Sequence, residues 1–228
     1  MDVVEYSDTG KQILEFLQEA KNYNAYLERC LLKFIGLDKK VADFGAGGGE
    51  FAGRLCKQGV DVTCIEVDPD LVAHLEKNNH TVVNNIEKIS DYDCIYSLNV
   101  LEHIEDDVAA LRSIYQALKP GGRFFLYVPA FNLLYTDVDK AVGHFRRYRR
   151  NELVKKCKES GFEVHEARYV DSLGFFCWCL LKFMPSKSGS LNPMAVKLYD
   201  QIVFPISRFL DVFFKKKLGK NLLLILKK

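Results

Sequence analysis

Apolar residues recur along the chain with two alternating periods, one typical of buried strands and one typical of amphipathic helices. Short apolar runs at Val41–Phe44, Val60–Val67, Thr81–Asn84, Tyr92–Leu98 and Arg123–Val128 predict strands. Helical spacing is found at Gln12–Ile35, at Gly48–Lys57, after the Asp68-Pro69 cap, and at Asp106–Leu118, where Lys119-Pro120-Gly121-Gly122 ends the helix. Strands that alternate with helices at this spacing predict a parallel, doubly wound α/β sheet.

The last hundred residues follow a looser pattern. A loop is expected over Ala130–Arg150, then a helix from Asn151 as N-cap to Ser160 and a strand at Phe162–Tyr169. Two apolar helical stretches, Ser172–Phe183 and Pro193–Phe214, precede a short final strand at Asn221–Leu226. We expect one domain, divided into an N-terminal lid helix (1–37), a ligand-binding core (38–170), a helical insertion (171–220) and a last strand (221–228).

Composition supports a single globular unit and excludes few functions. The 228 residues are 48% hydrophobic and 27% charged, enough for one substantial core. No signal peptide or spanning helix is indicated, and the seven scattered cysteines show neither a CxxC pair nor a Cys/His metal-ligand spacing. We therefore expect a reduced, cytoplasmic protein without a metal site.

The net charge of +2 hides an asymmetry between the two parts of the chain. Residues 1–139 carry 13 Lys and Arg against 23 Asp and Glu, whereas residues 140–228 carry 19 against 7. A basic C-terminal third suits an anionic substrate, a membrane surface or nucleic acid, although lysines that merely solvate helix faces explain it equally well.

The segment Val41–Phe51 combines a buried strand, glycines at 45, 47 and 49, and the start of a helix. It departs from the dinucleotide fingerprint, because the third glycine is misplaced and Glu50 would repel a pyrophosphate. Asp43 adds a second negative charge beside the turn, and Glu66 ends the next strand, where a carboxylate can accept hydrogen bonds from a ribose. A ligand with a ribose, a positive charge and no phosphate is S-adenosylmethionine (SAM).

The chain resembles the class I (Rossmann-like) SAM-dependent methyltransferases, of the type that acts on small molecules, over about residues 40 to 170. Five segments match the motifs of that family in order: Val41–Phe51, Cys64–Asp68, Asn84–Glu87, Asp93–Ile104 and Leu118–Arg123. The resemblance implies a seven-stranded, mostly parallel sheet with an antiparallel last strand, SAM as methyl donor and S-adenosylhomocysteine as product.

The resemblance also assigns roles to residues around the cofactor. Gly45, Ala46 and Gly47 would approach the methionine part through their backbone, and Asp43 would orient its ammonium group. Glu66 would hold the ribose, with Val67 packing on the adenine. Further positions expected to contact the cofactor are Asn85 and Ile86 at the adenine, Leu98 and Asn99 near the methyl donor, His103, and Tyr23 and Tyr26 of the lid helix. Asn85 departs from the aspartate that many relatives carry there, and turn capping is the alternative for Asp43 and Asn85.

The candidate residues for acceptor binding lie in the loop after the fifth predicted strand. This loop contains Gly143-His144-Phe145-Arg146-Arg147-Tyr148. His144 and Tyr148 are candidate bases, and Arg147 is a candidate anion-binding group or a partner for the acidic first part of the chain. His103 is a weaker candidate base, better explained by packing beside the cofactor.

We expect methyl transfer to oxygen or nitrogen, rather than carbon, of a small-molecule or lipid-linked acceptor. A protein or RNA acceptor, a dinucleotide oxidoreductase and a catalytically silent SAM-binding subunit are the alternatives, and no nucleic-acid-binding module is recognised. The insertion holds Phe175, Phe176, Trp178, Phe183, Met184, Phe204 and Phe209. It can form an acceptor pocket, the face of a homodimer, a peripheral membrane contact or a simple packed subdomain, and the chain is expected to be a monomer or a homodimer.

Overall fold

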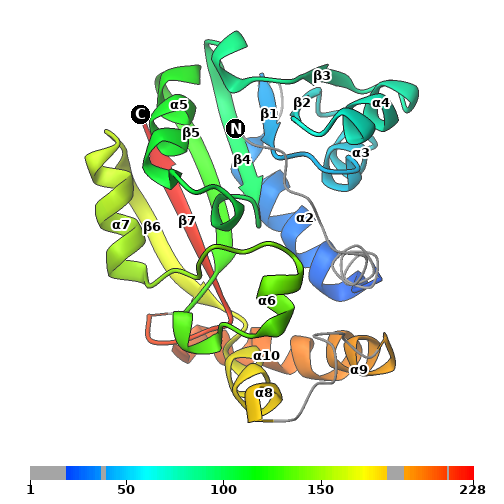
Figure 1. Ribbon diagram of the computed structural model, residues 1–228, viewed down its shortest axis with the longest axis vertical. Coiled ribbons are helices and arrows are strands. Elements are labelled where there is room, and N and C mark those ends of the chain that lie inside the picture. Colours follow the sequence, from blue (N-terminus) through cyan, green and yellow to red (C-terminus); the bar gives the residue numbers. More distant parts are fainter. Residues whose placement is uncertain (1–18, 37–39, 184–192, 215) are drawn as a thin grey trace.

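The computed structural model, which describes residues 19–36, 40–183, 193–214 and 216–228, folds into one seven-stranded sheet with helices on both faces (Figure 1). The strand order is β3-β2-β1-β4-β5-β7-β6. The strands are β1 (Val41–Phe44), β2 (Val62–Ile65), β3 (Thr81–Val83), β4 (Tyr92–Leu98), β5 (Leu118–Pro129), β6 (Glu163–Val170) and β7 (Asn221–Lys227). Because β7 is antiparallel to both of its neighbours and the other pairings are parallel, the expected mixed sheet is confirmed.

Most of the helices begin and end close to their predicted positions. The α-helices are α2 (Lys21–Ile35), α3 (Glu50–Cys56), α4 (Pro69–Lys77), α5 (Asp107–Ala117), α6 (Asp137–Ala141), α7 (Arg150–Glu159), α8 (Ser172–Phe183), α9 (Pro193–Leu198) and α10 (Phe204–Phe214). Three 3-10 turns add η1 (Ile86–Lys88), η2 (Leu101–His103) and η3 (Asn132–Leu134), and a π turn, η4 (Tyr199–Val203), joins α9 to α10. The part of the first predicted helix that precedes residue 19 lies outside the described residues.

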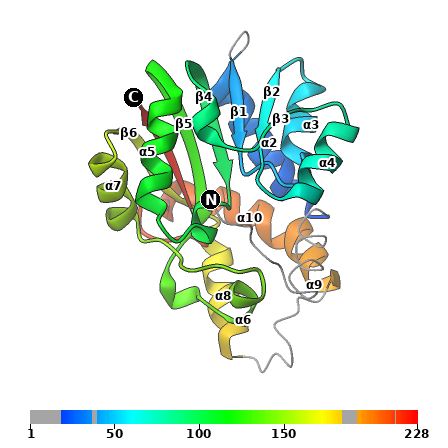
Figure 2. The ribbon, with the colours of Figure 1, turned by 45° about the horizontal axis from the view of Figure 1, so that its top comes forward.

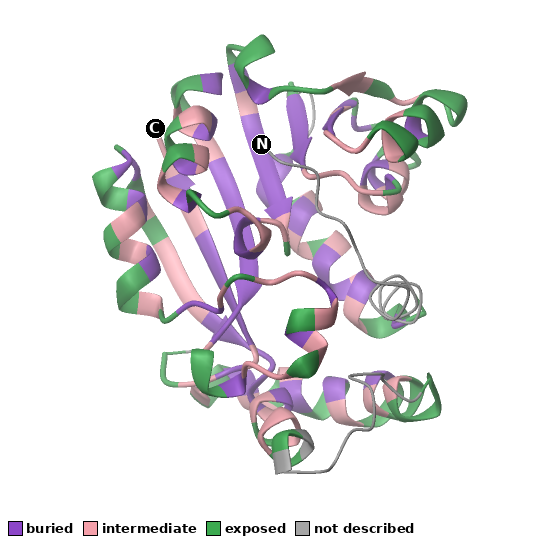
Figure 3. Cartoon of the chain, viewed as in Figure 1, coloured by how far each residue is buried: buried purple, intermediate pink, exposed green. Residues whose placement is uncertain are grey.

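The core consists of two layers, one on each face of the sheet (Figure 3). Successive strand residues point to opposite faces, so Ile95 of β4 packs with α5 and α7, whereas Cys94 and Tyr96 pack with α2, α3 and α4. This two-sided burial explains why the central strands read as continuous apolar runs.

Four local predictions were wrong. The segment Lys119–Gly122 is part of β5 as an irregularity in its pairing with β4, because Tyr92 pairs with Leu118 and Cys94 with Arg123. The predicted loop 130–150 contains η3 and α6. The N-cap of α7 is Arg149 rather than Asn151. The predicted helix Pro193–Phe214 is interrupted by the π turn.

Among the described residues, no helix has both the length and the apolar composition to cross a bilayer.

Two buried aspartates fasten the helical insertion to the rest of the fold. Asp200 accepts hydrogen bonds from the backbone N–H groups of Asn22 and Tyr23, both at 2.9 Å, and so caps the first turn of α2 from a distant part of the chain. Asp211 accepts from the N–H groups of Asp171 and Ser172 at 2.9 and 2.8 Å, where α8 begins. The helices α8 and α10 consequently pack against each other in the lower part of Figure 1, and α6 lies beside α8 (Figure 2).

Replacing Asp211 should destabilise the fold because two buried N–H groups would lose their acceptor. We expect Asp211→Ala to lower the free energy of unfolding by about 1–3 kcal/mol in urea denaturation. Asp137→Ala, which removes only an exposed ion pair with Lys140, is the matched control and should change it by less than about 0.5 kcal/mol. Equal effects of the two substitutions would contradict the anchoring role of Asp211.

Candidate active site

The glycine turn between β1 and α3 is shaped by backbone hydrogen bonds and by the absence of side chains. The N–H groups of Gly45 and Ala46 donate to the carbonyl of Ile65 at 2.9 and 3.2 Å. A Cβ on Gly45, which has φ 79°, would clash with the side chain of Val100. Apart from its chain neighbours, no atom of the described residues lies within 4 Å of the position a Cβ would take on Gly47, so that part of the structure leaves the turn open there. An open backbone turn after the first strand permits close approach of a ligand.

Glu66 connects the glycine turn to the end of β2. One carboxylate oxygen accepts from the N–H of Gly47 at 2.8 Å, and the other accepts from the N–H groups of Val67 and Asp68 at 2.8 and 3.1 Å. The carboxylate is therefore fixed between the glycine turn and the end of β2. The oxygen that accepts from Gly47 retains a lone pair for a ligand hydroxyl, whereas the other oxygen already accepts two hydrogen bonds.

Asp43 lies at the carboxyl end of β1 and is only 4% exposed. Its carboxylate accepts a hydrogen bond from the Tyr96 hydroxyl at 2.8 Å. Burial raises the pKa of Asp43 from 3.8 to about 7, although the bond from Tyr96 opposes the rise and the charge of Glu66 adds to it. A buried carboxylate of this kind is stabilised by a cationic ligand group.

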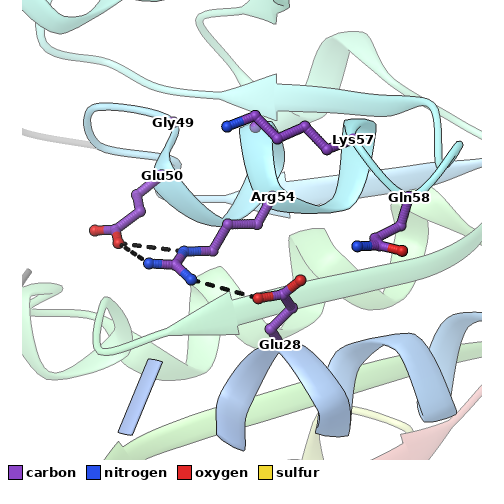
Figure 4. A pocket seen from close by; sticks show the side chains of 7 residues that line it. Glu28, Gly49, Glu50, Arg54, Lys57 and Gln58 are labelled. Atoms are coloured by element: carbon purple, nitrogen blue, oxygen red, sulfur yellow. Dashed lines mark hydrogen bonds and ion pairs between the residues drawn. The ribbon is translucent and has the colours of Figure 1, made fainter. Parts of the chain in front are cut away.

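Glu50 does not contribute a bare negative charge to the turn. Its carboxylate pairs with Arg54 at 2.8 Å, and Arg54 also reaches Glu28 of α2 at 3.4 Å (Figure 4). These residues line a shallow pocket between α2 and α3, with Gly49, Lys57 and Gln58 at its rim. Asp43 and Glu66, rather than Glu50, are therefore the acids beside the turn that have no cationic partner among the described residues.

Several other predicted cofactor positions have local roles in the structure. Asn85 is the N-cap of η1, where it accepts from the N–H of Glu87 at 2.9 Å, and Ile86 is buried behind it. Val67 and Leu98 are half-buried at the ends of β2 and β4. Adenine contact by these residues stays a prediction.

The two tyrosines of the lid helix point to different places. Tyr23 packs edge-on against Tyr127, and its side chain interacts with Asn99, a residue in the left-handed conformation with φ 53° at the end of β4. The Tyr26 hydroxyl accepts from Arg168 at 3.1 Å and its ring packs against Phe204. Tyr23 is therefore the tyrosine of α2 that lies beside the methyl-donor end of the predicted site.

The loop after β5 contains a buried carboxylate, imidazole and guanidinium held together. Asp139 of α6 contacts His144 Nδ1 at 2.7 Å and accepts two hydrogen bonds from Arg147, at 2.7 Å from Nε and 3.0 Å from the terminal nitrogen. Burial alone would raise the pKa of Asp139, but the bonds from His144 and Arg147 outweigh burial and lower it to about 2. Arg147 is thus engaged by an acid from the first part of the chain, one of the two possibilities left open by the sequence.

The turn after β4 brings Glu102 and His103 to the same place. His144 Nε2 lies 3.7 Å from a carboxylate oxygen of Glu102, and the His144 ring meets the His103 ring edge-on with centroids 4.6 Å apart. The N–H of Phe145 donates to the carbonyl of Glu102 at 2.9 Å, so the loop and the turn are joined through their backbones. Burial raises the pKa of Glu102 to about 7, with His144 and Arg147 opposing the rise.

Tyr148, a candidate base from the sequence, is fully buried. Its hydroxyl donates to the carbonyl of Leu101 at 3.2 Å and contacts Asp107 at 2.9 Å. Asp107 also pairs with Arg146 and Lys156 at 3.1 and 2.6 Å. Burial and the Asp107 charge raise the pKa of Tyr148 well above its ordinary value, and we leave Tyr148 out of the proposed catalytic groups.

Comparison with known proteins agrees with this geometry. A family model described as a methyltransferase domain matches residues 14–167, which is more than half of the chain. The chain belongs to this family. It is a SAM-dependent class I methyltransferase with a Rossmann-like fold, as the resemblance implied.

Curated relatives of this methyltransferase match a limited region. The ubiquinone biosynthesis O-methyltransferase of Xanthomonas oryzae pv. oryzae is 30% identical over 99 residues, which make up 38% of this chain and 41% of that protein. The chain thus covers less than half the length of this relative.

Solved structures match over nearly the whole methyltransferase. A chain of the complex between the Haloferax volcanii Trm112 methyltransferase activator and a methyltransferase aligns with a TM-score of 0.64 and 14% identity, covering 99% of both chains. A SAM-dependent methyltransferase from Archaeoglobus fulgidus aligns with a TM-score of 0.62 and 18% identity, covering 92% of this chain and 94% of that one. At such identities the likeness shows the fold alone.

Three side chains of the site were missed or undervalued by the sequence reasoning. Asp139 has a local signal, because Thr136 and Asp139 form a capping box at the start of α6. Glu102 was assigned to a motif without a role of its own. Trp178 was treated only as an apolar residue, yet its ring lies against the cations of Arg147 and Lys220 at 5.2 and 4.8 Å. No pattern within α8 shows that contact in advance.

Asp43 should link cofactor affinity and stability to pH. The folded pKa of about 7 exceeds the unfolded value of 3.8, so this carboxyl contributes stability that is present below about pH 4 and is lost as the pH rises toward 7. We expect Asp43→Asn to raise the melting temperature relative to wild type more at pH 8 than at pH 4.5, because the amide needs no proton.

The same substitution should weaken ligand binding. Loss of the charge that faces the ammonium group should reduce the affinity for S-adenosylhomocysteine by about 10- to 100-fold at pH 8, measured by calorimetry. In the wild type, affinity should rise between pH 5.5 and 8 as Asp43 ionises. Unchanged affinity and a flat pH profile would show that Asp43 does not bind the cofactor.

Proposed function

We propose that this methyltransferase transfers the methyl group of SAM to a hydroxyl oxygen of a small-molecule or lipid-linked acceptor, with nitrogen as the second choice of acceptor atom. The observation that carries the proposal is the polar centre formed by His144, Asp139 and Glu102 beside the ends of β4 and β5. The glycine turn follows β1, the other neighbour of β4, so both features lie along the ligand-binding edge of the sheet. The O-methyltransferase name of the curated relative supports an oxygen acceptor.

The reaction requires alignment and a way to stabilise the acceptor oxygen. A lone pair of that oxygen forms the bond to the methyl carbon while the electron pair of the C–S bond goes to sulfur, which becomes neutral in S-adenosylhomocysteine. A hydroxyl must also lose its proton, and a hydroxyl is a poor nucleophile until it does. We assign the binding of the acceptor hydroxyl to the His144 side chain, whose orientation Asp139 fixes through Nδ1, and the hydroxyl proton passes to solvent.

Replacing His144 should separate methyl transfer from cofactor binding. We expect His144→Ala to lower the rate of transfer from SAM carrying a tritiated methyl group to a responsive member of a panel of phenols, sugars and polyprenyl-linked sugars by about 100-fold or more. Affinity for S-adenosylhomocysteine should stay within about twofold of wild type. His165→Ala, which alters an exposed histidine paired with Glu163 on β6, is the matched control and should retain full transfer. Full transfer by His144→Ala would remove the assigned role.

A lipid-linked acceptor is favoured by the outer face of the α9–α10 helix, here called the apolar face. Five large side chains form it: Leu198, Ile202, Ile206, Phe209 and Phe213, each between 51% and 71% exposed. Their spacing places them on one side of the helix, opposite the buried Phe204 and Ser207. In Figure 3 the exposed residues of this helix alternate with buried ones.

The charges around the apolar face suit an anionic lipid surface. Both acids within the described residues of 193–214, Asp200 and Asp211, are buried on the inner side of the helix. Lys197, Lys216 and Lys217 are exposed. A helix with an apolar stripe and lysines but no exposed acid is typical of a segment that lies in the interface of an anionic membrane. We propose that this face rests on such a membrane and brings the active site to an acceptor there.

Vesicle binding tests the membrane contact. Wild type should float with vesicles containing phosphatidylglycerol and bind neutral phosphatidylcholine vesicles more weakly. Phe209→Ser with Phe213→Ser should reduce partitioning by at least about tenfold, since each inserted phenylalanine contributes about 1.5–3 kcal/mol. Lys216→Glu with Lys217→Glu should remove the preference for anionic lipid, whereas Lys155→Glu with Lys158→Glu on α7 should not.

A second copy of the chain is the alternative partner that could cover the apolar face. A dimer in light scattering that becomes a monomer on the phenylalanine substitutions, without any vesicle binding by wild type, would overturn the membrane proposal.

A further inference from the structure

Glu102, His103 and His144 bring one carboxylate and two imidazoles to a single point. Each side chain offers a ligand atom, and these atoms all lie within 4.8 Å of one another. Glu102 and His103 follow β4, whereas His144 comes from the loop after β5, so two neighbouring parallel strands deliver the three groups. Such a donor set is the type used by zinc enzymes with two histidines and one glutamate and by other first-row divalent ions.

Glu102 is the residue of this cluster that most needs a cation. It is 0% exposed, and neither of its carboxylate oxygens has a hydrogen-bond partner among the described residues. Leaving a buried carboxylate without partners costs several kcal/mol, so a compensating group is expected at that position.

A proton on His144 gives Glu102 a nearby charge but no hydrogen bond. The 3.7 Å between His144 Nε2 and the Glu102 oxygen exceeds hydrogen-bond distance. Two ligand atoms on a tetrahedral ion with bonds of about 2.1 Å stand about 3.4 Å apart, which is close to the separation observed. The gap is thus better matched to a metal ion than to a shared proton.

The surrounding contacts also resemble those of a metal site. Metal-binding histidines commonly use their second ring nitrogen to bond a carboxylate or a backbone carbonyl. Asp139 contacts His144 Nδ1 at 2.7 Å and is itself held by Arg147. The His103 ring interacts with the backbone of Gly143. Both imidazoles are therefore oriented by a second layer of bonds.

We propose that Glu102, His103 and His144 bind a divalent transition-metal ion, with zinc as the reference ion. The His144 side chain is 13% exposed, so the cluster has an edge open toward a ligand. A cation with an open position would hold the acceptor oxygen and lower the pKa of its hydroxyl, whose proton passes to solvent. This catalytic role rests on the proposed function, whereas metal binding itself does not.

Direct metal binding tests the proposal without an acceptor. Protein stripped with EDTA should bind one Zn²⁺ per chain in calorimetry, and Co²⁺ should give a visible absorption band from nitrogen and oxygen ligands. Glu102→Gln, which keeps the shape of the side chain, should weaken Zn²⁺ binding by more than about 100-fold. Replacing a residue that only hydrogen-bonds to a metal ligand typically weakens it by about 10- to 100-fold. His165→Ala should bind the ion like wild type.

Melting temperatures and circular dichroism test whether Glu102→Gln loses metal binding or its fold. Zn²⁺ should raise the melting temperature of wild type, because an ion that binds only the folded chain stabilises it, but not that of Glu102→Gln. Far-UV circular dichroism should show the same fold for both. Absence of stoichiometric binding to wild type, or equal affinity of Glu102→Gln, would overturn the metal site.

The outcome is separable from that of the proposed function. Methyl transfer that persists in EDTA, with normal binding of S-adenosylhomocysteine, rejects the metal and leaves the acceptor assignment intact. Metal binding with no transfer to any hydroxyl compound rejects the acceptor assignment and leaves the metal site intact.

Discussion

The structure depends on how its buried carboxylates are compensated, because each would otherwise cost several kcal/mol. Asp200 and Asp211 are satisfied by backbone N–H groups and fasten the insertion. Asp139 is satisfied by Arg147 and His144 and orders the loop after β5. Within the described part of the chain, Asp43 accepts one side-chain hydrogen bond, and the Glu102 oxygens accept none. The two under-compensated acids are therefore the ones that face the proposed cofactor ammonium and the proposed metal.

The sequence was sufficient for the sheet and for the identity of the cofactor because both depend on local signals. Buried strands, the Asp68-Pro69 cap and the glycine turn are each encoded within a few adjacent residues, and Asp68 caps α4 as predicted. The errors lie where a distant contact decides the local structure. The irregular start of β5 follows from pairing with β4, and the π turn occurs where Asp200 reaches back to α2.

The sequence identified the loop that contains the candidate acceptor-binding residues, but not the contacts that these residues make. His144 and Arg147 were identified from the loop sequence, yet their partner Asp139 and the approach of Glu102 require the turns after β4 and β5 to meet. Charge counts pointed to an acidic and a basic part of the chain, and the Asp139–Arg147 pair joins those parts. The Cys/His spacings sought in the sequence do not describe the proposed metal ligands, because two of these are adjacent and the third lies in the loop after the next strand.

The insertion connects the outer surface to the cofactor side through one helix. The inner side of η4 carries Asp200, which caps α2, and α2 places Tyr23 against Asn99 at the end of β4. The charge of Glu102 is close enough to raise the pKa of Tyr23 further, after burial and Asp171. Tyr23 therefore lies near both Asn99 and Glu102. Three hydrogen bonds join Asn22 and Tyr23 to Asp200 of η4, so the first turn of α2 is fixed directly to the helix that carries the apolar face.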